Sequence, residues 1–187
     1  MLTRVCRLAA ALILVALFVI PVMPSVATAA SGKELSRDAN AALAKLFDSN
    51  PAAKRLSQKA QAILVFPNML KAGFMFGGQI GEGALLRMGG KTVGYYNSVA
   101  ASYGLQAGAQ VFGYALFLMT DSAVRNLDAA GGFEVGVGPS FVVVDSGMAK
   151  TMSTSTLRYD VYGFIFDQKG AMAGLGIQGS KITRVSK

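Results

Sequence analysis

Apolar positions between residues 31 and 62 follow a helical period. Six of them recur at spacings that place them on one helix face: Leu35, Ala39, Ala42, Leu43, Leu46 and Phe47. The dipeptide Asn50-Pro51 then ends this pattern, because Asn50 or Ser49 can serve as the N-cap and Pro51 suits the first position of a new helix. A second helix is expected after it, and its inward positions are Ala52, Leu56, Ala60 and Ile63.

After Ile63 the period changes to two, which is typical of strands. Alternating apolar or small residues are found at Phe74, Phe76 and Ile80, at the odd positions from Tyr103 to Met119, at Phe133, Val135 and Val137, at Phe141 and Val143, and at Tyr159, Val161, Leu175 and Ile177. Four turn sequences separate the runs: Gly89-Gly90-Lys91, Gly131-Gly132, Asp145-Ser146-Gly147 and Asp167-Gln168-Lys169-Gly170. One short helix is expected near residues 121–130, with Thr120 or Asp121 as its N-cap and Gly131 at its end.

Glycine is the unusual residue of this chain. All 22 glycines follow residue 29 and make up about 14% of that part, against about 7% in average proteins. Glycine inside a strand indicates bulges, sharp coiling or close backbone approach. The predicted fold class is therefore α+β, with N-terminal helices packed on a strongly curved, glycine-rich antiparallel β-sheet or small barrel.

The first 29 residues have the pattern of a signal peptide. Arg4 and Arg7 precede an apolar run of 13 residues, and Ala27-Thr28-Ala29 has the small residues of a cleavage site. The run is shorter than the about 20 residues that a membrane-spanning helix needs. Cleavage would leave one domain over residues 30–187, helical over 33–62 and mainly β over 63–187. We expect it in the periplasm or secreted, with peripheral membrane association as an option.

Missing residue types exclude many kinds of chemistry. The chain has no histidine, and its one cysteine, Cys6, falls within the predicted leader. Histidine-based nucleophile activation, histidine metal sites, disulfides and zinc–thiolate sites are therefore excluded for the predicted domain. The acidic residues are scattered and form no recognisable pair or metal loop. No catalytic residue, cofactor or metal is predicted, and the protein is expected not to be an enzyme.

Basic residues give the chain a net charge of +8, which falls to +6 without Arg4 and Arg7. Lys54, Arg55 and Lys59, with Lys71 beyond them, form a basic cluster near the predicted helix–sheet junction. Such a cluster is either an ordinary solvated surface or a binding surface for an anionic membrane, where each cation contributes on the order of 1 kcal/mol. Nucleic acid is not expected, because aromatic residues do not interleave with the basic ones.

Residues 60–182 resemble the SYLF lipid-binding domain family. The resemblance is carried by Ala62-Ile63-Leu64-Val65-Phe66-Pro67, Lys71-Ala72-Gly73-Phe74, Gly77-Gly78, Gly81-Glu82-Gly83, Gly104-Leu105-Gln106-Ala107-Gly108, Val143-Val144-Asp145, Gly170-Ala171-Met172-Ala173-Gly174 and Gln178-Gly179. The chain departs from the family at Tyr95-Tyr96-Asn97-Ser98, where many members carry an aromatic and proline-rich stretch.

The resemblance implies lipid binding. Eukaryotic members bind phosphoinositides through a basic N-terminal amphipathic helix, and some bundle actin filaments; residues 33–47 and the basic cluster are the matching features here. The resulting hypothesis is a bacterial envelope protein that binds anionic phospholipid through Lys54, Arg55, Lys59 and Lys71 and an amphipathic helix. The alternatives are an envelope scaffold or protein-interaction module without lipid dependence, whose partner is unknown, and a small outer-membrane β-barrel.

Overall fold

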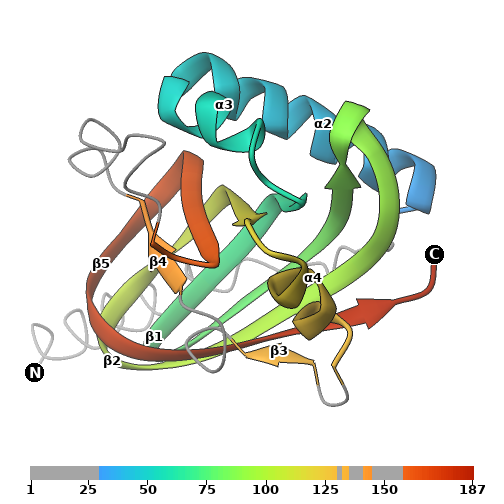
Figure 1. Ribbon diagram of the computed structural model, residues 1–187. Helices are drawn as coiled ribbons and strands as arrows, with labels where there is room; N and C mark the ends of the chain where they lie inside the picture. The colour runs from blue at the N-terminus through green and yellow to red at the C-terminus, as the bar shows by residue number, and fades with distance from the viewer. Residues whose placement is uncertain (1–29, 130–131, 135–140, 145–157) are drawn as a thin grey trace, which may run out of the picture.

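The computed structural model describes residues 30–129, 132–134, 141–144 and 158–187, so the predicted leader lies outside the described residues. The elements follow one another as α2 (Gly32–Ser49), α3 (Pro51–Ser57), β1 (Ala62–Arg87), the short 3-10 helix η1 (Met88–Gly90), β2 (Lys91–Leu118), α4 (Asp121–Leu127), β3 (Phe133–Glu134), β4 (Phe141–Val143) and β5 (Val161–Val185). Three of these strands are very long and curl together into a half-barrel, while α2 and α3 lie across its outside (Figure 1).

Both predicted N-terminal helices are present. Ser31 caps α2, and the Asn50 side chain caps α3 by accepting hydrogen bonds from the backbone N–H groups of Ala52 and Ala53. The second helix ends at Ser57, earlier than the expected helical region. Ile63 is buried but already belongs to β1, where it pairs with Phe117, because the apolar run that starts there suits a strand covered on both faces.

The sheet has the order β1-β2-β5-β3, and β4 also pairs with β5. β1 and β2 form a long antiparallel hairpin through η1, where Gly89 and Gly90 adopt the positive φ angles of 77° and 76°. The predicted turn at these glycines is therefore confirmed. The pairings of the described strands are antiparallel, as expected, except that the short strand β4 runs parallel to β5.

The prediction of a turn at residues 167–170 is wrong. β5 runs through it without a break, and the register against β2 shifts there between Val111 and Gly113. Asp167 and Gly170 have φ angles of 50° and 90°, so residues that favour turns make a bulge inside a strand. β1 has similar shifts, one of them at Met75, whose φ is 59°. These bulges bend the strands, and the predicted α+β class with a strongly curved, glycine-rich sheet is confirmed.

Two apolar layers cover the two faces of the sheet. The outer layer joins α2 and α3 to one face and includes Leu35, Ala39, Leu43, Leu46, Leu56, Ile63, Val65, Leu86, Phe117 and Phe164. The inner layer lies within the curl and includes Leu64, Phe66, Met69, Tyr96, Phe112, Leu116, Leu118, Leu127 and Ile182. The predicted short helix α4, capped by Thr120, closes the inner layer.

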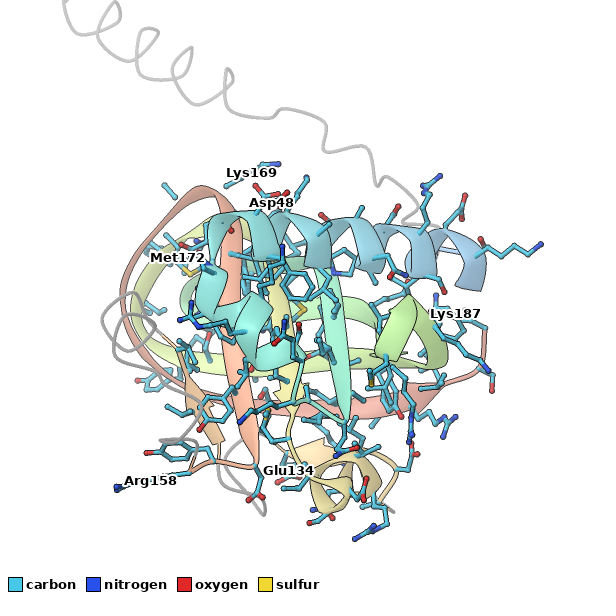
Figure 2. The ribbon with its side chains drawn as sticks, turned by 45° about the horizontal axis from the view of Figure 1, so that its top comes forward. Asp48, Glu134, Arg158, Lys169, Met172 and Lys187 are labelled. Carbon is cyan, nitrogen blue, oxygen red and sulfur yellow. The ribbon has the colours of Figure 1, made fainter. Side chains whose placement is uncertain are left out.

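Several expected features lie outside the described residues. They are the strand positions Val135 and Val137, the turn at Asp145-Ser146-Gly147 and the helix end at Gly131. Ion pairs tie distant parts of the described chain together. The Asp167 carboxylate lies 3.6 Å from the Lys45 ammonium and 3.7 Å from that of Lys169, and Lys187 Nζ lies 2.8 Å from Glu82 Oε1. Figure 2 labels two of these residues, Lys169 and Lys187, which lie far apart on the molecule.

Candidate functional site

Three of the four candidate lipid-binding residues lie together on the outside of the molecule. Lys54 and Arg55 are exposed on α3, and Lys59 is exposed in the segment that follows it. The opposite side of α3 is buried against the sheet, so the helix presents its basic side outward. No acidic residue occurs between Pro51 and Lys59, so this segment of the chain carries only positively charged side chains.

The fourth candidate, Lys71, lies elsewhere. It belongs to β1, pairs in register with Gln110 of β2, and lines a cavity on the inner face of the curled sheet. Because α3 packs on the outer face, the sheet separates Lys71 from Lys54, Arg55 and Lys59. The prediction of one cluster of four cations is wrong in this respect, since sequence proximity does not show that the strand turns this side chain inward.

The apolar face of α2, the amphipathic helix expected to contact lipid, packs against the sheet instead. The apolar stripe of α2 is buried in the outer apolar layer. Polar contacts also hold α2 to the hairpin: Asn40 Nδ2 donates to the Gly90 carbonyl at 3.2 Å, and the Thr92 hydroxyl donates to Ser36 Oγ at 2.9 Å. In this structure the apolar stripe of α2 is therefore covered by the sheet.

A surface that the sequence reasoning missed lies where the three long strands bend away from the helices. We call it the sheet lobe and define it as residues 72–81 of β1, 98–110 of β2 and 170–180 of β5, which pair with one another. None of these three segments contains Asp, Glu, Lys or Arg. The absence of charge from each segment is visible in the sequence, but only the pairing shows that the three segments form one surface.

The described part of the sheet lobe exposes large apolar side chains on its outer face. Phe74, Phe76 and Tyr103 are 75%, 68% and 64% exposed, and the rings of Phe76 and Tyr103 lie 4.9 Å apart. Ile80 and Val99, which pair in register, are exposed beside them. Contiguous exposed apolar groups of this kind mark interaction surfaces rather than ordinary solvated ones.

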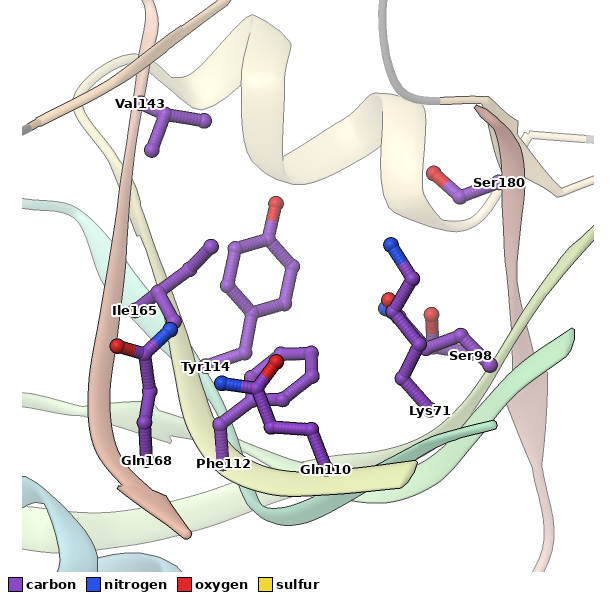
Figure 3. Close-up of a pocket in the computed structure, with 10 residues that line it drawn as sticks. Lys71, Ser98, Gln110, Phe112, Tyr114, Val143, Ile165, Gln168 and Ser180 are labelled. Carbon is purple, nitrogen blue, oxygen red and sulfur yellow. The ribbon is translucent and has the colours of Figure 1, made fainter. Parts of the chain in front are cut away.

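The inner face of the same lobe is polar. It contributes to a cavity of about 250 Å³ whose lining comes from all three long strands and β4 (Figure 3). The lining residues are Lys71, Gln79, Ser98, Gln110, Phe112, Tyr114, Val143, Ile165, Gln168 and Ser180. Burial raises the pKa of the Tyr114 phenol, so it stays protonated there. Among these described lining residues Lys71 carries the one charge.

A polar tie closes the other end of the curl. The buried Tyr96 hydroxyl donates to Asp128 Oδ1 at 2.8 Å, and Arg184 Nη1 donates to Asp128 Oδ2 at 2.9 Å. Burial, followed by the hydrogen bond to Asp128, raises the pKa of Tyr96. This group joins β2, the end of α4 and β5. In the described part of the chain, no group of three or more His, Cys, Asp or Glu residues is placed to bind a metal.

Comparison with known protein families identifies part of this architecture. The family described as Ysc84, Las17-binding protein actin regulator, matches residues 99–187, which span most of β2, α4 and β5. This match is consistent with the SYLF resemblance and covers just under half of the chain. The resemblance found in the sequence is therefore confirmed over that segment. No curated protein matches the chain. Among the residues that the structure describes, no helix is both long and apolar enough to cross a membrane.

Proposed function

We propose that this SYLF protein is a non-enzymatic lipid-binding protein of the bacterial envelope, which associates with the surface of a membrane that contains anionic phospholipid. The observation that carries the proposal is the sheet lobe, whose outer face exposes Phe74, Phe76 and Tyr103 without any charged residue in its three strand segments. Aromatic and aliphatic side chains gain free energy at the boundary between headgroups and acyl chains, whereas charged ones there are costly.

Electrostatic attraction is the second part of the proposal. Lys54, Arg55 and Lys59 form an exposed basic surface without an acidic neighbour in the same segment. At about 1 kcal/mol for each cation near anionic headgroups, three of them supply an attraction that is useful but reversible. Stable binding to a membrane surface needs both electrostatic attraction and burial of apolar area, and the lobe supplies the apolar area.

The structure changes the mechanism that the sequence suggested. Insertion of α2 would require its apolar stripe to leave the core and would expose the matching face of the sheet. The lobe needs no such rearrangement, because its apolar side chains are already outside. Association through the lobe is therefore the less costly mechanism. The predicted leader, which would direct the chain into the envelope, supports the location.

A protein-interaction module is the second candidate function. The family description names Las17 binding and actin regulation, which are protein contacts. The exposed rings of the lobe would also suit a protein partner, since aromatic side chains are enriched at interface hot spots. This candidate predicts retrieval of a protein partner and no dependence on lipid.

Vesicle co-sedimentation with the purified protein separates these functions. We expect binding to vesicles of phosphatidylglycerol and phosphatidylcholine, and weaker binding to phosphatidylcholine alone. Lys54→Glu, Arg55→Glu and Lys59→Glu together should reduce binding to the anionic vesicles at least about tenfold, from on the order of 1 kcal/mol per cation.

A matched control reverses three dispersed exposed cations, Lys33→Glu, Arg125→Glu and Arg158→Glu, which changes the net charge equally. Its binding should fall clearly less than that of the α3 variant. Equal losses in the two triple variants would show that only net charge matters. No binding of the unmodified protein to either vesicle would remove the lipid function and favour the protein-interaction module.

A further inference from the structure

The inner face of the curled sheet changes character along its length. Near α4 it is apolar, with Phe112, Leu116 and Leu118 packed in the inner layer. Towards the sheet lobe the same face carries amides, hydroxyls and the Lys71 ammonium around the cavity. Polar side chains therefore replace apolar ones in the part of the face that encloses a cavity.

Two of the lining polar side chains are deeply buried. Ser98 is 2% exposed and Gln79 is 7% exposed, and both face the cavity. Apolar cavities stay empty, but a polar one of about 250 Å³ is large enough for roughly eight waters or for a small polar ligand. Its volume lies just below the range of small-molecule sites, about 300–1,000 Å³, so a headgroup fits and a whole lipid does not.

The chemistry of the lining selects the ligand. Lys71 supplies an ammonium, Gln110 and Gln168 supply amide donors and acceptors, and none of the described lining residues is acidic. Figure 3 shows the Lys71, Gln110 and Gln168 side chains extending into the same space. Charge-assisted hydrogen bonds from an ammonium favour an anion, while amides and hydroxyls suit hydroxyl groups. Phe112 and Ile165 provide an apolar wall for a short carbon chain.

We infer that this cavity is a binding site for a small phosphate ester that carries hydroxyl groups, of the glycerol phosphate type, with the phosphate at Lys71 and the hydroxyls at the surrounding amides. Such a group occurs free in solution and as the headgroup of a phospholipid. The inference rests on the proposed function only where the lipid is the source, and the inner and outer faces of the lobe can be tested separately.

Calorimetric titration with glycerol 3-phosphate and with glycerophosphoglycerol tests the site, and glycerol serves as the probe without phosphate. We expect both phosphate esters to bind and glycerol to bind much more weakly. Lys71→Met should weaken the binding of the esters at least about tenfold, since it removes a hydrogen bond to a charged group. Lys71→Arg should restore part of it. The matched control Lys33→Met, at an exposed position on α2, should bind like the unmodified protein.

Each outcome decides the inference. Absence of ester binding to the unmodified protein, or unchanged binding by Lys71→Met, would overturn it. If Lys71→Met does not fold, as its unfolding midpoint will show, Gln168→Leu at an exposed position of the lining is the substitute, with the same expected loss.

Vesicle binding distinguishes this inference from the proposed function. The α3 charge reversal should reduce vesicle binding and leave titration with glycerol 3-phosphate unchanged. A protein that binds vesicles but neither ester would contradict only the cavity site, whereas one that binds the esters but no vesicle would contradict only the membrane function. A loss of phosphatidylglycerol vesicle binding by Lys71→Met would identify the lipid as the source, and retained binding would identify the soluble ester.

Discussion

At the scale of single residues, Ser31 and Glu34 hold the start of α2 through reciprocal hydrogen bonds. The Ser31 backbone N–H donates to Glu34 Oε2 at 3.0 Å, and Ser31 Oγ accepts from the Glu34 backbone N–H at 3.3 Å. This capping box satisfies two backbone donors that would otherwise lack helical partners. The bond from the Ser31 backbone, followed by that from its hydroxyl, lowers the pKa of Glu34 below its ordinary value of 4.5.

This lowered pKa predicts a pH dependence of stability. Because the pKa of Glu34 is lower in the folded protein, its stabilisation is complete above the unfolded-state pKa and is lost as the pH falls through the folded-state pKa. The melting temperature of the unmodified protein should therefore fall more steeply below about pH 4.5 than that of Glu34→Gln, followed by circular dichroism. In a Ser31→Ala background the substitution should change this slope less. Identical slopes with Ser31 present would contradict the role of the pair.

At the scale of elements, the long strands bend where bulges and glycines occur together. Gly108 in β2 has a φ of 138°, and a side chain there would meet the backbone of Ala171 in β5. On the facing strand, Gly170 has a φ of 90° and would meet the Ala109 carbonyl oxygen. At these two positions glycine is therefore needed because two curled strands approach each other closely.

Replacement of Gly108 by alanine should destabilise the protein by about 1–3 kcal/mol, since the new residue would occupy a strained backbone conformation without room for its Cβ. Gly78→Ala in the same lobe is the matched control, because its Cβ would meet nothing closer than the Ala100 carbonyl oxygen at 3.8 Å. Urea unfolding of both variants measures the difference. A loss of stability in Gly78→Ala as large as that in Gly108→Ala would refute the argument.

At the scale of the whole molecule, the two faces of the sheet are covered by different elements and expose different side chains. The helices bury their apolar stripes on one part of the outer face, and the rest of that face is the exposed lobe. The inner face is closed by α4 at one end and forms the polar cavity towards the other. The proposed membrane contact, the basic residues of α3 and the inferred ligand site therefore lie on separate surfaces, which allows each to be changed alone.

If the lobe contacts the membrane, replacing its exposed aromatic residues should weaken membrane binding. Phe74→Ser with Phe76→Ser should reduce co-sedimentation with phosphatidylglycerol vesicles roughly tenfold, because two apolar side chains no longer leave water on binding. The melting temperature should change little, since both side chains are mostly exposed. Met88→Ser, at an even more exposed apolar residue outside the lobe, is the control and should leave binding unchanged. Equal effects of the two variants would show that the lobe is not the contact surface.

Local structure followed closely from the sequence. The caps at Asn50 and Thr120, the inward positions of α2 and the glycine turn at η1 were all predictable, because each depends on interactions between residues a few positions apart. The same local reasoning was wrong at residues 167–170. Turn-forming residues there make a bulge instead, because pairing with β2 continues on both sides of them.

The sequence by itself determined the two helices and the caps, the glycine-rich β region, the net positive charge and the absence of histidine, since these are local or compositional properties. Only the tertiary structure decided that Lys71 lies inside the curl, that the apolar stripe of α2 is covered, and that three uncharged segments meet in one exposed lobe. These features depend on register between strands far apart in the chain, and a shift of one residue would move every side chain to the other face.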